Sequence, residues 1–242
     1  MKVSIILPTY NEEKNIVGLI HSVIENIPAE RDYEIIVVDD NSPDGTYAAV
    51  ANAFRDNSHV IPILRTSDPG LAASILDGIK RARGEQIVVM DSDFTHDPAE
   101  IPRLLHVGEI YDIVSGSRFC AGGRMVNTAH YIASMIYNWL LRLVLGTQVQ
   151  DNLGGYFAAK KLDIMSLPVE RIFFGYGDYF FRLLHFAQLN KLSIVEVPAQ
   201  YMMRSRGASK SNYLKMIYTY TSAALRLKYD IYRLEKGGRK PT

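Results

Sequence analysis

The sequence is poor in cysteine and has no strong net charge. Cys120 is the only cysteine among 242 residues, so the chain cannot form an internal disulfide or a zinc site built from several cysteines. A single thiol fits a reducing compartment such as the cytoplasm. The 27 basic residues nearly balance the 26 acidic ones. Nothing in this balance attracts nucleic acid, so any positively charged site has to be local.

Long hydrophobic runs are absent as well. No stretch approaches the roughly 18 apolar residues that a membrane-spanning helix needs, because Arg142 and Arg226 interrupt the two longest candidates, residues 131–145 and 216–227. The N-terminus, MKVSIILP, has one charge and a short apolar run before Pro8. That pattern is typical of a buried strand rather than a signal peptide. We expect no spanning segment, although either candidate could lie on a membrane surface.

Glycine-rich phosphate loops are also missing. A dinucleotide-binding fold would place G-x-G-x-x-G after its first strand, but residues 8–13 read PTYNEE. Two acids and no glycine would repel a phosphate, so a base or ribose fits this turn better. No G-x-x-x-x-G-K-[ST] motif occurs either. A bound diphosphate would therefore depend on a metal ion.

Alternating apolar patterns indicate the fold class. Strands are predicted at 3–7, 34–38, 59–65 and 86–90, with helices at 11–26, 46–55 and 71–83 between them. We expect Gly84 to cap the third helix. This βαβ alternation predicts an α/β fold with a mostly parallel central sheet and helices on both faces. The second half is less regular: helices are predicted at 98–110, 127–145, 162–167, 179–189 and 212–234, and strands at 112–117 and 193–197.

Polar residues follow three of the predicted strands. The first strand leads into residues 8–10 (PTY), the second into 39–40 (DD) and the fourth into 91–93 (DSD). Ligands of parallel sheets lie beyond the carboxyl ends of the strands, so these residues should meet in one crevice. Asp91 and Asp93 are two positions apart and should point to the same side. A divalent cation would relieve their repulsion, and Mg²⁺ favours a few carboxylates together with phosphate oxygens. The alternative is a surface turn with a polar end.

Several segments together resemble family 2 glycosyltransferases of the GT-A fold. They are ILPTYNE at 6–12, VVDDNSPDGT at 37–46, MDSDFTHDP at 90–98 and GSR at 116–118. Their order further resembles polyprenyl-phosphate glycosyltransferases such as dolichol-phosphate mannose synthases, whose basic loop matches VEVP at 195–198 followed by RSRGASK at 204–210. The resemblance covers about residues 3–215. It implies a Rossmann-like GT-A domain at 1–211, followed by a C-terminal amphipathic helix and tail at 212–242.

The resemblance also implies roles for individual residues. The donor nucleotide sugar would contact Pro8, Tyr10, Glu12, Val38, Asp39, Asp40, Asp91, Ser92, Asp93 and Arg118. Mg²⁺ or Mn²⁺ would bind at Asp91, Asp93 and Thr95. The acceptor phosphate would meet Arg118, Arg204, Arg206, Ser209 and Lys210. The catalytic group would comprise Asp93, Asp178 and Arg204.

We expect a metal-dependent, inverting transfer of one sugar, mannose in preference to glucose. The donor would be GDP-mannose or a UDP-sugar, and the acceptor a polyprenyl phosphate such as dolichyl or undecaprenyl phosphate. An ionised phosphate needs no strong base, whereas a hydroxyl on a glycan or surface polysaccharide would need one. Asp178 is the candidate base, although it equally suits the N-cap of helix 179–189. Another alternative is a non-catalytic nucleotide-sugar-binding subunit. His96 fits a polar turn better than a metal ligand.

Two segments suit a lipid interface. Residues 131–145 include Trp139, the sole tryptophan, on an apolar face, and residues 212–234 combine tyrosine with lysine and arginine. Both could instead pack on the sheet or in an oligomer. We expect a peripheral protein on the cytoplasmic face of a membrane, with a membrane subunit or a second copy of the chain as further candidate partners and no nucleic acid.

Overall fold

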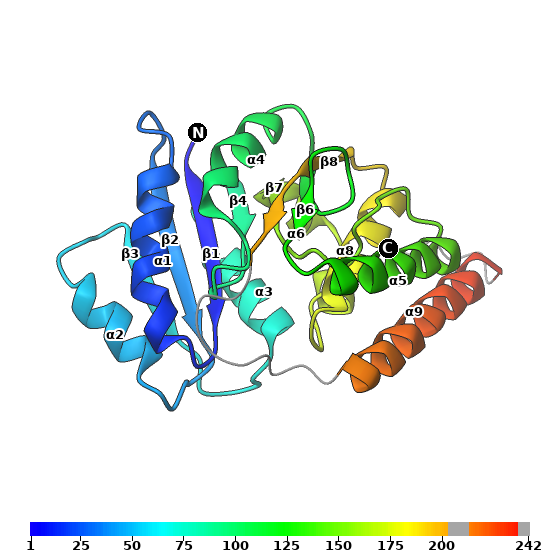
Figure 1. Ribbon diagram of the computed structural model, residues 1–242, viewed down its shortest axis with the longest axis horizontal. Helices are drawn as coiled ribbons and strands as arrows, with labels where there is room; N and C mark the ends of the chain where they lie inside the picture. Colours follow the sequence, from blue (N-terminus) through cyan, green and yellow to red (C-terminus); the bar gives the residue numbers. More distant parts are fainter. Residues whose placement is uncertain (203–212, 237–242) are drawn as a thin grey trace.

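The computed structural model describes residues 1–202 and 213–236 (Figure 1). Its centre is a seven-stranded sheet in the order β3-β2-β1-β4-β7-β5-β8. These strands are β1 (Val3–Thr9), β2 (Tyr33–Asp39), β3 (Val60–Leu64), β4 (Gln86–Val89), β5 (Ile113–Ser117), β7 (Phe157–Lys160) and β8 (Ile194–Pro198). The short strands β6 (Arg124–Met125) and β9 (Gln200–Tyr201) pair in parallel beside it.

All strands of the large sheet run in one direction except β7, which is antiparallel to both of its neighbours, β4 and β5. The carboxyl ends of the other strands therefore share one edge of the sheet. This confirms the prediction of a mostly parallel sheet. β7 itself was not predicted, because Phe157-Ala158-Ala159-Lys160 contains no β-branched residue and two alanines.

Helices cover both faces of this sheet, as predicted. One face holds α1 (Glu13–Asn26), α2 (Thr46–Ala53) and α4 (Ile101–Val107); the other holds α3 (Leu71–Arg81), α5 (Thr128–Leu145), α6 (Lys161–Ser166), α7 (Val169–Ile172), α8 (Tyr179–Leu189) and α9 (Tyr213–Lys236). Side chains of a strand alternate between the faces. Ile5 and Leu7 thus pack with α1, whereas Ile6 packs with α3. Burying each such side chain contributes about 1.5–3 kcal/mol.

Several predicted helices end earlier than expected, including those at 98–110 and 71–83. The helix predicted at 98–110 is a 3₁₀ turn (Pro98–Glu100) followed by α4, which ends at Val107. The helix predicted at 71–83 ends at Arg81, so Gly84 does not cap it. Gly84 instead lies against β1, where its N–H donates to Ser4 Oγ at 2.8 Å. A Cβ at Gly84 would lie 2.6 Å from the Ser4 nitrogen, so close backbone approach requires glycine here.

The helices α5 and α9 lie side by side at one end of the molecule (Figure 1). α5 buries Leu141 and Leu145, and α9 buries Tyr220, Ala224, Leu227 and Ile231. The outward side of α5 is apolar and exposed; it consists of Ile132, Met135, Ile136, Trp139, Leu140 and Leu143. No helix within the described ranges is long and apolar enough to cross a membrane. The predicted division at residue 211 falls outside the described residues.

Candidate active site

The turns after β1 and β2 are joined by Asp39. Its Oδ1 accepts hydrogen bonds from Thr9 Oγ1 at 3.0 Å and Ser42 Oγ at 2.5 Å, and its Oδ2 accepts one from the Ser42 N–H at 2.9 Å. Ser42 Oγ in turn accepts from the Asn11 N–H at 2.9 Å. Asp39 is fully buried. These contacts favour a supporting role for Asp39, and its direct contact with a donor stays a prediction.

Asp40 is directed toward the start of α3. Its Oδ2 accepts from the Gly70 N–H at 2.7 Å, and its Oδ1 forms an ion pair with Arg65. Arg65 also donates to Ser74 Oγ at 3.0 Å. Asp40 therefore connects the end of β2 to the loop that precedes α3.

The other predicted donor residues lie around the same sheet edge. Tyr10 is 49% exposed, whereas Val38 is fully buried beneath the surface. Glu12 is buried and accepts from Asn15 Nδ2 at 2.7 Å. The carbonyl of Pro8 accepts from Ser92 Oγ at 2.9 Å, which attaches the first turn to the loop after β4. Tyr10 therefore offers the most accessible surface for a nucleobase or ribose.

The two carboxylates that follow β4 differ in exposure. Asp91 has a 47% exposed side chain, whereas Asp93 is 9% exposed. Asp93 Oδ1 accepts from the backbone N–H and the hydroxyl of Thr95, at 3.0 and 2.6 Å. The hydroxyl of Thr95 therefore orients Asp93. The role of Thr95 as a metal ligand stays a prediction, and this geometry favours a role in which Thr95 positions the carboxylate of Asp93 instead.

This loop supplies a donor set that suits a hard divalent cation. Within residues 1–202 and 213–236, no group of three or more histidine, cysteine, aspartate or glutamate side chains could hold a metal ion. Two aspartates alone leave most of the coordination sphere to other oxygens. Mg²⁺ and similar ions commonly bind in this way, through one or two carboxylates together with phosphate oxygens and water. Asp91 and Asp93 therefore fit a cation that binds jointly with a diphosphate.

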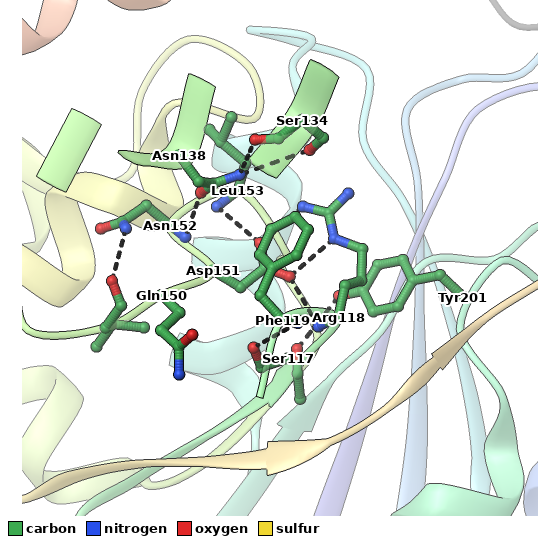
Figure 2. Close-up of polar contacts among 12 residues, drawn as sticks. Ser117, Arg118, Phe119, Ser134, Asn138, Gln150, Asp151, Asn152, Leu153 and Tyr201 are labelled. Carbon is green, nitrogen blue, oxygen red and sulfur yellow. Dashed lines mark hydrogen bonds and ion pairs between the residues drawn. The ribbon is translucent and has the colours of Figure 1, made fainter. Parts of the chain in front are cut away.

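Arg118, directly after β5, is fixed by a buried ion pair (Figure 2). Its Nε and Nη2 donate to the two carboxylate oxygens of Asp151 at 2.8 and 2.7 Å, and its backbone N–H donates to Asp151 Oδ2 at 3.1 Å. The guanidinium carbon lies 5.1 Å from the ring centre of Phe119 and 4.8 Å from that of Tyr201. Burial alone would lower the pKa of Arg118, but the Asp151 carboxylate outweighs it and raises this pKa. Arg118 is therefore a preorganised cation.

Asp151 is held by its own surroundings. Its N–H donates to Glu196 Oε1 at 2.9 Å. The next residue, Asn152, donates its N–H to Asn138 Oδ1 on α5 at 2.7 Å. Neither Asp151 nor Tyr201 was predicted from the sequence as part of the site. The only signal for Asp151 was the polar run Gln150-Asp151-Asn152 after a long apolar helix, and nothing in the sequence distinguished Tyr201 from the chain's other tyrosines.

Asp178 occupies a turn near Asp40. A Cβ at Gly70 would lie 3.6 Å from the Gly175 carbonyl, so this turn borders the α3 loop. Asp178 is 4% exposed; its Oδ1 accepts from the Tyr176 N–H at 2.9 Å, and its Oδ2 pairs with Arg182. Asp178 occupies the N-cap position of α8, as the alternative predicted, but its side chain makes no capping hydrogen bond to the helix. Its role as a base stays a prediction.

The predicted basic residues Arg204, Arg206, Ser209 and Lys210 lie outside the described residues. The described residue Met202 contacts the carboxylate loop, because its N–H donates to the Thr95 carbonyl at 2.9 Å. The site therefore brings together the turns after β1 and β2, the Asp91–Asp93 loop and Arg118. Tyr201 links Arg118 to the carboxylate loop: its ring centre lies 4.8 Å from the guanidinium carbon of Arg118 and 4.8 Å from the ring centre of His96, whose Nδ1 accepts from the Asp91 N–H.

Known proteins resemble this chain in sequence and in fold. Residues 4–164 match the family model described as glycosyl transferase family 2. A dolichol-phosphate mannosyltransferase of Pyrococcus furiosus is 35% identical over 90% of this chain, and the match spans 63% of that protein, which is less than two thirds of its length. An undecaprenyl-phosphate mannosyltransferase of Micrococcus luteus is 33% identical over 87% of each chain.

Among solved structures, the fold resembles glucosyl-3-phosphoglycerate synthase from Mycobacterium tuberculosis in complex with Mn²⁺, uridine diphosphate and glucosyl-3-phosphoglycerate. The TM-score is 0.69 at 22% identity, and the match covers 93% of this chain and 79% of the other. This likeness supports the predicted fold, and the sequence matches support the predicted family. The chain belongs to glycosyltransferase family 2.

Proposed function

We propose that this protein transfers one sugar, with mannose favoured over glucose, from a nucleotide-sugar donor to a polyprenyl phosphate. The transfer inverts the configuration of the sugar and depends on Mg²⁺ or Mn²⁺. The observation that carries the proposal is a buried arginine, Arg118, whose guanidinium carbon lies 4.8 Å from the ring centre of Tyr201, while the same ring packs against His96, which accepts a hydrogen bond from the Asp91 N–H. The names of the two mannosyltransferase relatives support the same acceptor class.

On the donor side, Asp91 and Asp93 would hold the cation. When bound, the cation would neutralise negative charge that develops on the leaving diphosphate. Thr95 keeps Asp93 in one orientation through its hydroxyl. Tyr10 and Asp40 would bind the nucleoside part, since they follow β1 and β2 in turns that lack a glycine-rich phosphate loop.

On the acceptor side, Arg118 binds the anion. Asp151 occupies Nε and Nη2, which leaves Nη1 for a phosphate oxygen. Because the pair with Asp151 fixes the guanidinium before the acceptor arrives, little side-chain freedom is lost on binding. The acceptor phosphate is ionised at neutral pH, so attack on the sugar needs no protein base.

A lipid acceptor requires access to a membrane surface, and α5 offers one. Its outward side exposes Trp139 by 58% and Leu143 by 70%. Tryptophan and aliphatic side chains on one side of a helix suit the interface between headgroups and acyl chains. α5 also carries Asn138, which contacts the Asn152 next to Asp151. The same helix thus borders both the proposed lipid surface and the support of Arg118.

A product assay tests this proposal. Purified protein is incubated with radiolabelled GDP-mannose or UDP-glucose and a short-chain polyprenyl phosphate, with Mg²⁺, Mn²⁺ or EDTA. We expect lipid-linked sugar that requires a divalent cation. D93A should lower kcat/KM by about 10³-fold or more, whereas D56A, at an exposed loop position, should match the unmodified protein. If no donor and cation together yield a lipid-linked sugar, the proposed acceptor is wrong.

A further inference from the structure

His96 lies under the carboxylate loop with an unusual pattern of contacts. Its Nδ1 accepts a hydrogen bond from the Asp91 N–H at 2.9 Å. A neutral imidazole that accepts at Nδ1 carries its proton on Nε2. Nε2 is buried and has no hydrogen-bond partner in the part of the chain that the structure describes, and it lies 3.7 Å from Asp91 Oδ2. A donor is therefore positioned beside the predicted metal ligand.

The orientation of this ring is fixed from two sides. Tyr156 stacks on it with ring centres 4.8 Å apart and planes 10° apart, and its own hydroxyl donates to the Asp97 carbonyl at 2.9 Å. Tyr201 meets the ring edge-on at 4.8 Å. His96 is 1% exposed. The ring cannot turn Nε2 toward water without displacing these tyrosines, so Asp91 is the acceptor within reach.

We propose that His96 is a positioning residue for Asp91. Its Nε2–H donates to Asp91 Oδ2 when the cation is bound, which leaves Oδ1 for the metal. A modest rotation of the half-exposed Asp91 side chain shortens the 3.7 Å separation to hydrogen-bond distance. Carboxylates that bind a metal commonly accept hydrogen bonds from neighbouring side chains, which fix their orientation. This inference rests on the proposed function, because it concerns the cation of that site.

Two amide variants separate the two nitrogens of His96. In H96N, the amide oxygen replaces Nδ1 as acceptor for the Asp91 N–H but no group replaces the Nε2 donor. In H96Q, the amide nitrogen replaces the Nε2 donor but the Nδ1 acceptor is lost. H106N serves as control, since His106 is exposed on α4. The readout is Mn²⁺ affinity in the presence of GDP or UDP, from the paramagnetic resonance signal of free Mn²⁺.

We expect H96N to weaken Mn²⁺ affinity by about 10- to 100-fold, H96Q to stay within about threefold of the unmodified protein, and H106N to show no change. The ¹⁵N resonances of His96 should show a proton on Nε2. Unchanged affinity in H96N overturns the inference, as does a loss in folded H96Q that equals or exceeds 10-fold. If the unmodified protein binds no Mn²⁺ with either nucleotide, both the metal dependence in the proposed function and this inference are wrong. If the unmodified protein binds Mn²⁺ and H96N binds it equally well, only this inference is wrong.

Discussion

Arg118 and Asp151 form a buried ion pair in which two guanidinium nitrogens meet two carboxylate oxygens at 2.8 and 2.7 Å. Their side chains are 8% and 0% exposed. Removing one partner of such a pair leaves the other charge buried without compensation. We expect D151N to lower the free energy of unfolding by about 3–5 kcal/mol and to raise the KM for the polyprenyl phosphate. Urea denaturation and steady-state kinetics measure the two effects.

The double variant R118M/D151L separates stability from acceptor binding. Replacing both charges by apolar side chains removes the unpaired charge, so stability should return to within about 1–2 kcal/mol of the unmodified protein. Activity should stay low, because the Arg118 cation proposed to bind the phosphate is absent. Normal kinetics in this stable double variant would show that Arg118 does not bind the acceptor.

Thr95 is expected to act on the metal through Asp93. T95V keeps the shape of the side chain but removes the hydroxyl that donates to Asp93 Oδ1 at 2.6 Å. We expect Mn²⁺ affinity to fall by about 10-fold and T95S to restore it, as measured by calorimetric titration with GDP present. A loss that T95S fails to restore would contradict a role for the hydroxyl.

The positions of the first four strands along the chain, and the polar residues that follow three of them, could be predicted from the sequence. There, β-branched apolar runs alternate with segments whose apolar residues have helical spacing. The family motifs put Asp91, Asp93 and Arg118 beyond the ends of strands, and in the structure they follow β4 and β5. The sequence near each strand is enough to place these residues, because each motif directly follows its strand.

The strand β7 and the side chains that hold Arg118 in place could not be predicted from the sequence. β7 is four residues long and rich in alanine, so its local propensity is low although it occupies the centre of the sheet. Asp151 meets Arg118 across 33 positions of the chain. Tyr201 reaches the same cation from β9. Such contacts depend on tertiary packing, for which a single sequence has no local pattern.

Substitution of Asp178 tests whether the acceptor is a phosphate or a hydroxyl. Its carboxylate pairs with Arg182 in a buried turn. If the acceptor is an ionised phosphate, D178N should lower stability by about 3 kcal/mol yet reduce kcat less than about 10-fold. Complete loss of turnover in a folded variant that still binds the donor would instead indicate a general base and a hydroxyl acceptor. Donor titration and product assays decide between them.

The outward side of α5 is expected to bind lipid. Trp139 and Leu143 are exposed, so W139A/L143Q should leave the unfolding midpoint unchanged. We expect its partition onto vesicles of anionic and zwitterionic lipid to fall several-fold, because apolar area no longer enters the interface. L162Q is the matched control, since Leu162 is 82% exposed on α6. Equal vesicle binding by both variants would exclude α5 as the membrane contact.

His185 should make stability depend on mildly acidic pH. Burial, together with the positive charge of Lys228, lowers the pKa of His185 to about 4. The unfolded chain has an ordinary histidine pKa near 6.5 and therefore binds more protons than the folded protein between about pH 6.5 and 4. The contribution is fully present above pH 6.5 and is lost as pH falls toward 4, by about 3 kcal/mol at most. Urea denaturation at pH 7 and pH 4.5 should show this loss in the unmodified protein and in H106L. H185L should lack it, and equal losses in H185L and the unmodified protein would assign the effect to other groups.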